Sequence, residues 1–354
     1  MSPAIRYRAG AMTTDPAPDD DRLDRTGPPP PVSVIMPVLN EERYLRAAVA
    51  GILGQQYDGA MEVVLAVGPS RDATGDIAAR LAAEDPRVTV VENPSGRTPR
   101  GLNAAIHASN HPVIVRVDGH GVLPDGYVRR AVEVLRETGA DNVGGMMVPE
   151  GTTPFEQAVA YAMTSRVGIG GARFHVGGEA GPAETVFLGV FRRRVLDRLG
   201  GFDETFTRAQ DWELNYRIRR SGGLVWFTPD LHVSYRPRST VRALARQFFH
   251  TGQWRRHVMQ RYPETASFRY LAPPAAVVLL GAGTAAAVIG PVVGLPLLAW
   301  GAIAPAGYVV LLAVSAVATG RRLPVRARAW LSPVLATMHL AWGGGFLRGP
   351  GRTR

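Results

Sequence analysis

The 354-residue chain contains neither cysteine nor lysine. Without cysteine there can be no disulfide framework, thiolate nucleophile or cysteine-ligated metal centre. Without lysine there can be no Walker-type phosphate loop and no Schiff-base intermediate, since both need that side chain. All 40 basic residues are therefore arginines, and with 30 acids they give a formal charge of +10. This excess predicts an anionic partner: nucleic acid, acidic lipid or a phosphorylated substrate.

Residues 1–31 lack both apolar periodicity and the apolar core of a signal peptide. They are rich in Pro, Asp, Arg and Thr, so we expect a disordered tail. The remaining length suffices for one large catalytic domain and an appendage.

From residue 32 onwards, short apolar runs alternate with helical patterns. Strands are predicted at residues 32–37, 61–67, 88–91, 113–117, 143–148 and 185–191, and helices at 44–53, 75–83, 102–106, 128–135 and 154–164. The alternation predicts an α/β domain with a mainly parallel, doubly wound sheet. The glycine-rich residues 166–182 are expected to form a mobile loop over the site.

Four polar residues, Asn40, Asp72, Asn93 and Asp118, each follow a predicted strand. Because the carboxyl ends of parallel strands meet at one edge, we expect these side chains to line a single crevice. Asn40 is also expected to cap the first helix. The alternative for Asp72 and Asp118 is a purely structural one, in which each caps the helix or turn that follows.

The apolar run that starts at Val113 ends in Asp118-Gly-His120. A carboxylate at a strand end, with a second ligand two residues later, suits a hard divalent cation that also holds phosphate oxygens. Further along, Asp211 lies in the first turn of a predicted helix. An acid there either complements the helix dipole or acts as a general base, and its position alone leaves both open.

Six motifs in order resemble family 2 glycosyltransferases, closest to the succinoglycan-biosynthesis, ExoA-like branch. They are Pro37-Val-Leu-Asn-Glu-Glu42, residues 68–74, Asn93 with residues 101–103, Arg116-Val-Asp-Gly-His120, residues 200–204 and Gln210-Asp211. The resemblance covers about residues 32–260. It implies the nucleotide-sugar-binding fold called GT-A and inversion at the anomeric carbon.

The resemblance also implies roles for individual residues. Asp118 and His120 would coordinate Mg²⁺ or Mn²⁺ as cofactor, and Asp211 would be the catalytic base. The implied donor-binding residues are Pro37, Asn40, Glu42, Asp72, Asn93, Asn103, Arg116 and Asp118, and the implied acceptor-side residues are Gln210, Glu213, Gln247 and Trp254. Family members usually carry an acid at the end of the second strand, where this chain has Ala66 and Val67.

The C-terminal third changes character. Residues 236–269 hold eight arginines and one acid, and residues 270–320 hold no charged side chain. The uncharged run is long enough for two membrane-spanning helices, so we expect the basic segment to bind acidic headgroups rather than nucleic acid. Within it, Gln247 to Trp254 resembles the family's acceptor-side element; an ordinary amphipathic interfacial helix is the alternative.

A third apolar segment, residues 329–347, contains Pro333 and three consecutive glycines, and arginines follow it. The positive-inside rule then favours two spans, with this segment interfacial or re-entrant. The predicted divisions are a tail (1–31), a catalytic domain (32–235), a basic interfacial segment (236–269), two spans (270–320) and a C-terminal region (321–354).

Together these patterns predict a glycosyltransferase anchored in the inner membrane, with a cytoplasmic catalytic domain. It would move a hexose from a nucleotide-diphosphate sugar to a polyprenyl-linked or polysaccharide acceptor. One alternative transfers the sugar directly to polyprenyl phosphate. Another, suggested by Ala66 and Val67, is a non-catalytic membrane scaffold that retains the fold.

Overall fold

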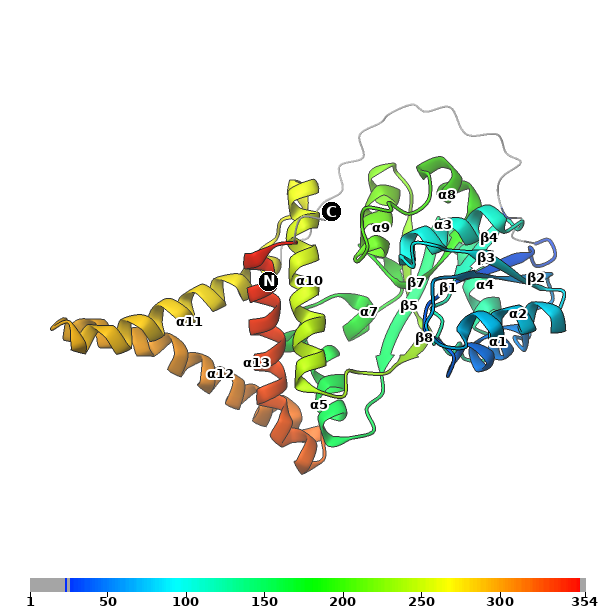
Figure 1. Cartoon of the computed structure of the whole chain (residues 1–354). Helices are drawn as coiled ribbons and strands as arrows, with labels where there is room; N and C mark the ends of the chain where they lie inside the picture. The colour runs from blue at the N-terminus through cyan, green and yellow to red at the C-terminus, as the bar shows by residue number, and fades with distance from the viewer. Residues whose placement is uncertain (1–22, 24–25, 351–354) are drawn as a thin grey trace.

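The computed structural model describes Leu23 and residues 26–350. Its N-terminal part is built on an eight-stranded sheet of order β3-β2-β1-β4-β7-β5-β8-β6 (Figure 1). The strands are β1 Val32–Val38, β2 Met61–Val67, β3 Val88–Glu92, β4 Val113–Arg116, β5 Asn142–Pro149, β6 Gly181–Pro182, β7 Phe187–Arg192 and β8 Val225–Tyr235. Strands β3, β2, β1 and β4 are parallel, whereas β7 and β6 run antiparallel to their neighbours. The predicted α/β fold with a mostly parallel sheet is confirmed.

Helices cover both faces of this sheet. The core on one face is formed by α1 (Leu45–Leu53), α2 (Thr74–Glu84) and α4 (Tyr127–Thr138). The core on the other face is formed by α3 (Thr98–Ala108), α8 (Arg193–Leu199) and α9 (Gln210–Arg220). A strand covered on both sides reads as a continuous apolar run, which explains the pattern of β4.

The sequence predicts two flexible segments. Residues 166–182, the expected mobile loop, contain α6 (Arg166–Ile169), α7 (Arg173–Val176) and strand β6, which pairs with β8, and their mobility stays a prediction. Most of the predicted disordered tail lies outside the described residues. Its last part is packed on the domain, where Arg136 Nη2 donates to the Gly27 carbonyl at 2.7 Å. These segments are held by tertiary contacts, which local composition does not report.

A second layer of helices follows the sheet domain. Helix α10 (Val241–Arg261) and helix α13 (Val325–Arg348) lie side by side and pack with α5 (Pro154–Met163) (Figure 1). Apolar residues of helix α12 (Ile303–Thr319) complete this core. The layer therefore joins the sheet domain to the most apolar part of the chain.

That apolar part is a helical hairpin. Helix α11 (Phe268–Val292) and helix α12 (Ile303–Thr319) project away from the sheet domain (Figure 1), with the 3₁₀ segments η3 (Pro296–Ala302) between them and η4 (Gly320–Arg322) after them. Within the described residues, Phe268–Val292 and Pro296–Ala318 are the two stretches long and apolar enough to cross a membrane. Only 6% of either window is buried, and such an exposed apolar surface indicates a membrane or protein contact.

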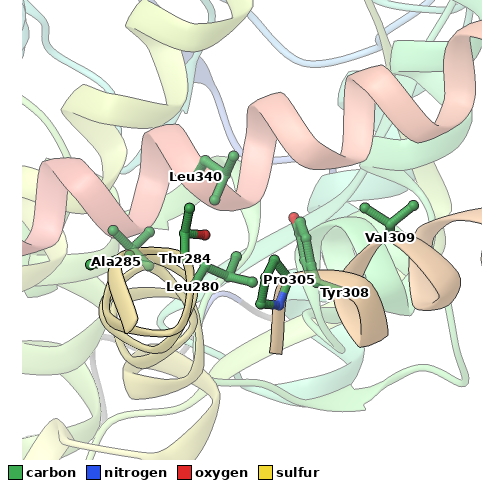
Figure 2. A pocket seen from close by; sticks show the side chains of 9 residues that line it. Leu280, Thr284, Ala285, Pro305, Tyr308, Val309 and Leu340 are labelled. Carbon is green, nitrogen blue, oxygen red and sulfur yellow. The ribbon is translucent and has the colours of Figure 1, made fainter. Parts of the chain in front are cut away.

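The hairpin and α13 line an apolar hollow of about 580 Å³ that is largely open to the surface (Figure 2). Figure 2 shows Leu280 and Thr284 of α11, Tyr308 of α12 and Leu340 of α13 around it. Of the nine residues that line it, Tyr308 alone carries a titratable group. Since acid–base chemistry needs more than this, the chemistry has to be sought elsewhere.

Close helix packing explains the glycines of the third apolar segment. A Cβ at Gly345 of α13 would overlap the Phe249 carbonyl of α10, and a Cβ at Gly252 of α10 would overlap the Trp342 carbonyl of α13. The two backbones therefore touch, as small residues allow between helices. Residues 329–347 lie within one continuous helix that contains Pro333, and their position relative to a membrane stays a prediction.

The neighbouring glycine provides a matched test of this packing. A Cβ at Gly344 would lie 4.0 Å from Phe249 Cε2, in ordinary contact. Alanine is favoured over glycine in a helix by about 1 kcal/mol, so we expect Gly344→Ala to preserve or raise the unfolding temperature in detergent. Gly345→Ala should lower it, since overpacking costs on the order of 1–3 kcal/mol. Equal unfolding temperatures for the two variants would contradict the backbone contact.

Candidate functional site

The site lies at the edge of the sheet where four parallel strands end. Strands β1, β2, β3 and β4 stop at Val38, Val67, Glu92 and Arg116. The loops after them carry the predicted polar residues Asn40, Asp72, Asn93 and Asp118. The order of the strands makes these loops neighbours.

The loops after β1 and β2 are tied together through Asn40. Its Oδ1 accepts from the Arg71 backbone N–H at 2.8 Å, and its own N–H donates to Ser70 Oγ at 3.0 Å. Asn40 has a φ of 58°, a left-handed conformation that asparagine tolerates better than most residues. It does not cap the first helix, contrary to expectation, because α1 begins after Tyr44.

Glu42 and Asp72 complete the link between these loops. Glu42 Oε2 accepts from the Ala73 N–H at 3.1 Å, and the Glu42 N–H donates to Asp72 Oδ2 at 3.3 Å. The Thr74 hydroxyl donates to Asp72 Oδ1 at 2.6 Å, and this bond, with backbone N–H donors, holds the pKa of Asp72 below its usual range. Both acids thus brace the loops, and their contact with a donor stays a prediction.

Arg116 joins two acids that are far apart in sequence. Its side chain is 5% exposed; Nη2 donates to Asp118 Oδ1 at 2.9 Å, and Nη1 donates to Asp211 Oδ1. The carboxylates of Asp118 and Asp211 remain about one third exposed, at 32% and 34%. The residue expected in the metal motif and the residue expected as base therefore share one guanidinium at the sheet edge.

Glu41 is a site residue that motif reading missed. Its Oε1 lies 2.9 Å from His120 Nδ1, and this hydrogen bond raises the pKa of His120. A Cβ at Gly119 would come within 2.8 Å of Glu41 Cγ, so the glycine between Asp118 and His120 makes room for the glutamate. The available sequence signal was the pair of adjacent glutamates in the first motif, Glu41 and Glu42. Only the fold shows that Glu41 is the one that meets His120.

The other predicted donor residues lie deeper. Asn93 is 4% exposed, and its amide donates to the Arg97 carbonyl at 3.2 Å. A Cβ at Gly101 would lie 2.7 Å from Asn93 Nδ2 and 3.2 Å from Pro37 Cβ, so these motif residues pack against one another. Asn103 exchanges hydrogen bonds with the Phe202 backbone at 2.9 Å each, which anchors the loop before α9.

Of the predicted acceptor-side residues on α9, Glu213 is not placed as expected. It is fully buried; its carboxylate pairs with Arg217 at 2.7 Å and accepts from the Tyr262 hydroxyl at 2.8 Å. The buried Glu213 carboxylate helps to hold α9 against the segment after α10. It is therefore not open to an acceptor. Gln210 is also largely buried, at the start of the helix that carries Asp211.

Gln247 and Trp254, the predicted acceptor-side pair on α10, are half-buried. Gln247 accepts from Arg238 Nε at 3.0 Å and donates to the Tyr235 hydroxyl at 3.2 Å. Trp254 packs on Phe206, with ring centroids 6.0 Å apart. Both residues therefore connect α10 to segments that flank the site.

The strand order and the polar edge are those expected of the GT-A fold. Residues 33–200 match the model described as Glycosyl transferase family 2. The chain is 32% identical to the succinoglycan biosynthesis protein ExoA of Rhizobium meliloti (strain 1021), over 89% of this chain and 93% of that protein. The chain therefore belongs to glycosyltransferase family 2. It is an enzyme family, so the alternative of a non-catalytic scaffold is not supported.

Two further comparisons agree with the fold. The chain is 22% identical to a dolichyl N-acetyl-alpha-D-glucosaminyl phosphate 3-beta-D-2,3-diacetamido-2,3-dideoxy-beta-D-glucuronosyltransferase of Methanococcus voltae, over 61% of this chain and 70% of that one. The solved mannosyltransferase PcManGT of Pyrobaculum calidifontis, in complex with GDP-Man and Mn²⁺, superposes with a TM-score of 0.56 at 23% identity. The superposition covers 89% of this chain and 87% of that chain. At this identity the superposition supports the fold.

The shared guanidinium leads to a stability prediction. We expect Arg116→Met to lower the free energy of unfolding by roughly 1–3 kcal/mol, since it leaves two neighbouring carboxylates without their cation; the range allows for their partial exposure. Adding Asp211→Asn should recover part of the loss, because one of the two negative charges is then gone. Thermal unfolding in detergent measures both, and a double variant no more stable than Arg116→Met would argue against charge repulsion.

Proposed function

We propose that the enzyme transfers a hexose, with inversion, from a nucleotide-diphosphate sugar to a hydroxyl of a lipid-linked or polysaccharide acceptor. The observation that carries the proposal is the pairing of Asp118 and Asp211 on Arg116. It brings together a carboxylate that can hold the cation of the diphosphate leaving group and a carboxylate that can take the proton of the attacking hydroxyl. An inverting transfer needs both around the anomeric carbon, in one displacement.

Asp211 is proposed as the general base. An acceptor hydroxyl is a weak nucleophile until a carboxylate takes its proton. Asp211 lies in the first turn of α9 with about a third of its side chain open to solvent, so an acceptor can reach it. Direct transfer to polyprenyl phosphate would attack with an ionised oxygen and need no base, and the placement of Asp211 therefore favours the hydroxyl acceptor.

Asp118 and His120 are proposed to hold the divalent cation. Asp118 uses Oδ1 for Arg116, and His120 uses Nδ1 for Glu41, which leaves Oδ2 and Nε2 as ligand atoms. A histidine whose other nitrogen meets a carboxylate is the usual second-shell arrangement of metal sites. Bound there, Mg²⁺ or Mn²⁺ would neutralise the charge of the diphosphate leaving group.

The described residues contain no group of three His, Asp or Glu side chains arranged for a metal ion. Two protein ligands therefore fit a hard cation that completes its coordination with water and phosphate oxygens. The complex of the archaeal mannosyltransferase with GDP-Man and Mn²⁺ supports this donor class and metal.

We further propose that the catalytic domain faces the cytoplasm on the inner membrane. The apolar hairpin α11–α12 and the arginines before and after it support this orientation. The names of the ExoA protein and of the archaeal dolichyl-linked transferase support a polysaccharide or lipid-linked acceptor. Positive charge along α10 would then face acidic headgroups and the acceptor phosphates.

Asp211→Asn tests the base directly. We expect it to retain donor affinity and to slow transfer by about 10²- to 10⁴-fold, as for loss of a general base. Donor affinity is measured by isothermal titration with a panel of nucleotide sugars, and transfer is measured on membranes that contain the native acceptor. A collapse of donor binding would instead make Asp211 a structural acid of α9.

Asp118→Asn tests the metal site. We expect it to abolish metal-dependent donor hydrolysis and to weaken Mn²⁺ binding followed by electron paramagnetic resonance. His120→Ala should weaken binding less, because water can replace one ligand. Glu41→Gln, which changes only the partner of His120, should weaken Mn²⁺ binding about 10- to 100-fold. Wild-type Mn²⁺ affinity in Asp118→Asn would remove the basis of the site.

A further inference from the structure

A second polar cluster lies where α9, α10 and the start of α11 meet, apart from the shared guanidinium of Arg116. It centres on Trp212, Arg255 and Tyr270, and Ser267 adjoins it at the start of α11, where its carbonyl accepts from the Tyr270 N–H at 3.0 Å. The Arg255 guanidinium carbon is 4.7 Å from the ring centre of Trp212 and 4.0 Å from that of Tyr270. Arg255 of α10 is thus stacked against two aromatic rings, that of Trp212 on α9 and that of Tyr270 on α11.

Stacking does not satisfy this guanidinium. An aromatic face attracts the positive charge of a guanidinium, but it does not accept the hydrogen bonds that the N–H groups offer within the guanidinium plane. Arg255 Nη1 is buried without a hydrogen-bond partner. Burial also lowers the pKa of Arg255, so the protein holds the charge at a cost that stacking only partly offsets.

Two more donors in the cluster are left in the same state. Trp212 Nε1 and Ser267 Oγ are buried and without a hydrogen-bond partner. Ser267 precedes α11 as its N-cap, yet its side chain makes no capping bond. Buried polar atoms are nearly always paired, and three unpaired donors, one of them on a cation, favour a ligand that is an anion with several acceptor oxygens.

The nearby acid is already engaged. Among the described residues, Glu184 is the carboxylate whose charge acts on Arg255. It is bonded to Arg269 at 2.6 Å and is largely exposed, and Arg269 also donates to the Tyr270 hydroxyl. These contacts hold the rim of the cluster and leave the three inner donors unpaired.

We propose that Arg255, Trp212 Nε1 and Ser267 Oγ bind a phosphate group of a membrane lipid. The location sets the class of ligand, because Ser267 immediately precedes α11, the first stretch apolar enough to enter a membrane. Phosphates of lipids lie at that depth. A phosphate bound there neutralises the arginine and accepts hydrogen bonds from the three donors.

The position relative to Asp211 makes the lipid-linked acceptor the favoured source of this phosphate, and this part rests on the proposed function. Trp212 follows Asp211 in α9, and successive side chains on a helix point in different directions. Helix α9 would therefore carry both the proposed base and a donor to the acceptor phosphate. Phosphatidylglycerol of the bilayer is the second source of the same chemistry.

The experiment uses the full chain in phosphatidylcholine nanodiscs that carry either polyprenyl diphosphate or phosphatidylglycerol, with bound lipid counted by native mass spectrometry. Arg255→Gln should weaken polyprenyl diphosphate binding about 10- to 100-fold, as expected for a lost charged hydrogen bond. Trp212→Phe keeps a ring but lacks the N–H, and should weaken it several-fold. Arg198→Gln, an equal loss of charge on α8, is the matched control and should have no effect.

Comparing the two lipids shows whether the bound phosphate comes from the lipid-linked acceptor or from the bilayer. Loss confined to polyprenyl diphosphate supports an acceptor subsite, and equal loss of both lipids supports a bilayer phospholipid site. Unchanged binding of both lipids in Arg255→Gln and Trp212→Phe, with unfolding temperatures near the wild-type value, would overturn the proposal. Donor hydrolysis is assayed on the same samples, so that a failure of the proposed function is seen separately from a failure of lipid binding.

Discussion

The site depends on one buried guanidinium. Arg116 is the last residue of β4, a central strand that is hydrogen-bonded to β1 on one side and to β7 on the other. From there it holds Asp118 at 2.9 Å and also bonds Asp211, which is 95 residues away in sequence. Taking two carboxylates partly out of water is unfavourable unless a cation stays between them. In a chain without lysine, arginine is the side chain that can supply this cation, and its planar fork serves two acids at once.

The sequence predicted the sheet edge well because its signals are local. Each unit pairs an apolar strand with a helix, and the bounds of β2 agree with the predicted range 61–67. That the polar residues after successive strands meet at one edge of the sheet followed from the predicted topology alone. Four of the predicted positions, Asn40, Asp72, Asn93 and Asp118, do lie in loops after neighbouring strands.

What the sequence could not predict depends on partners distant in the chain. Glu41 and His120 are 79 residues apart, and no periodicity connects them. Glu213 has the same motif context as Asp211, yet the helix turns it into the interior, where Arg217 and Tyr262 engage it. The sequence likewise does not predict that the donors of Trp212 and Ser267 are unpaired, because this depends on how α9, α10 and α11 pack. Function here is assembled by tertiary contacts, whereas motifs report only which loops take part.

The glycine contacts between α10 and α13 have a consequence for substrate choice. Because the backbones of α10 and α13 touch at Gly252 and Gly345, the helix that follows the sheet domain and the helix that follows the apolar hairpin form one closely packed pair. For the membrane-anchored enzyme proposed above, this packing would fix the height of Asp211 above the lipid surface. Acceptors would then be selected by length, because the terminal hydroxyl has to reach that height.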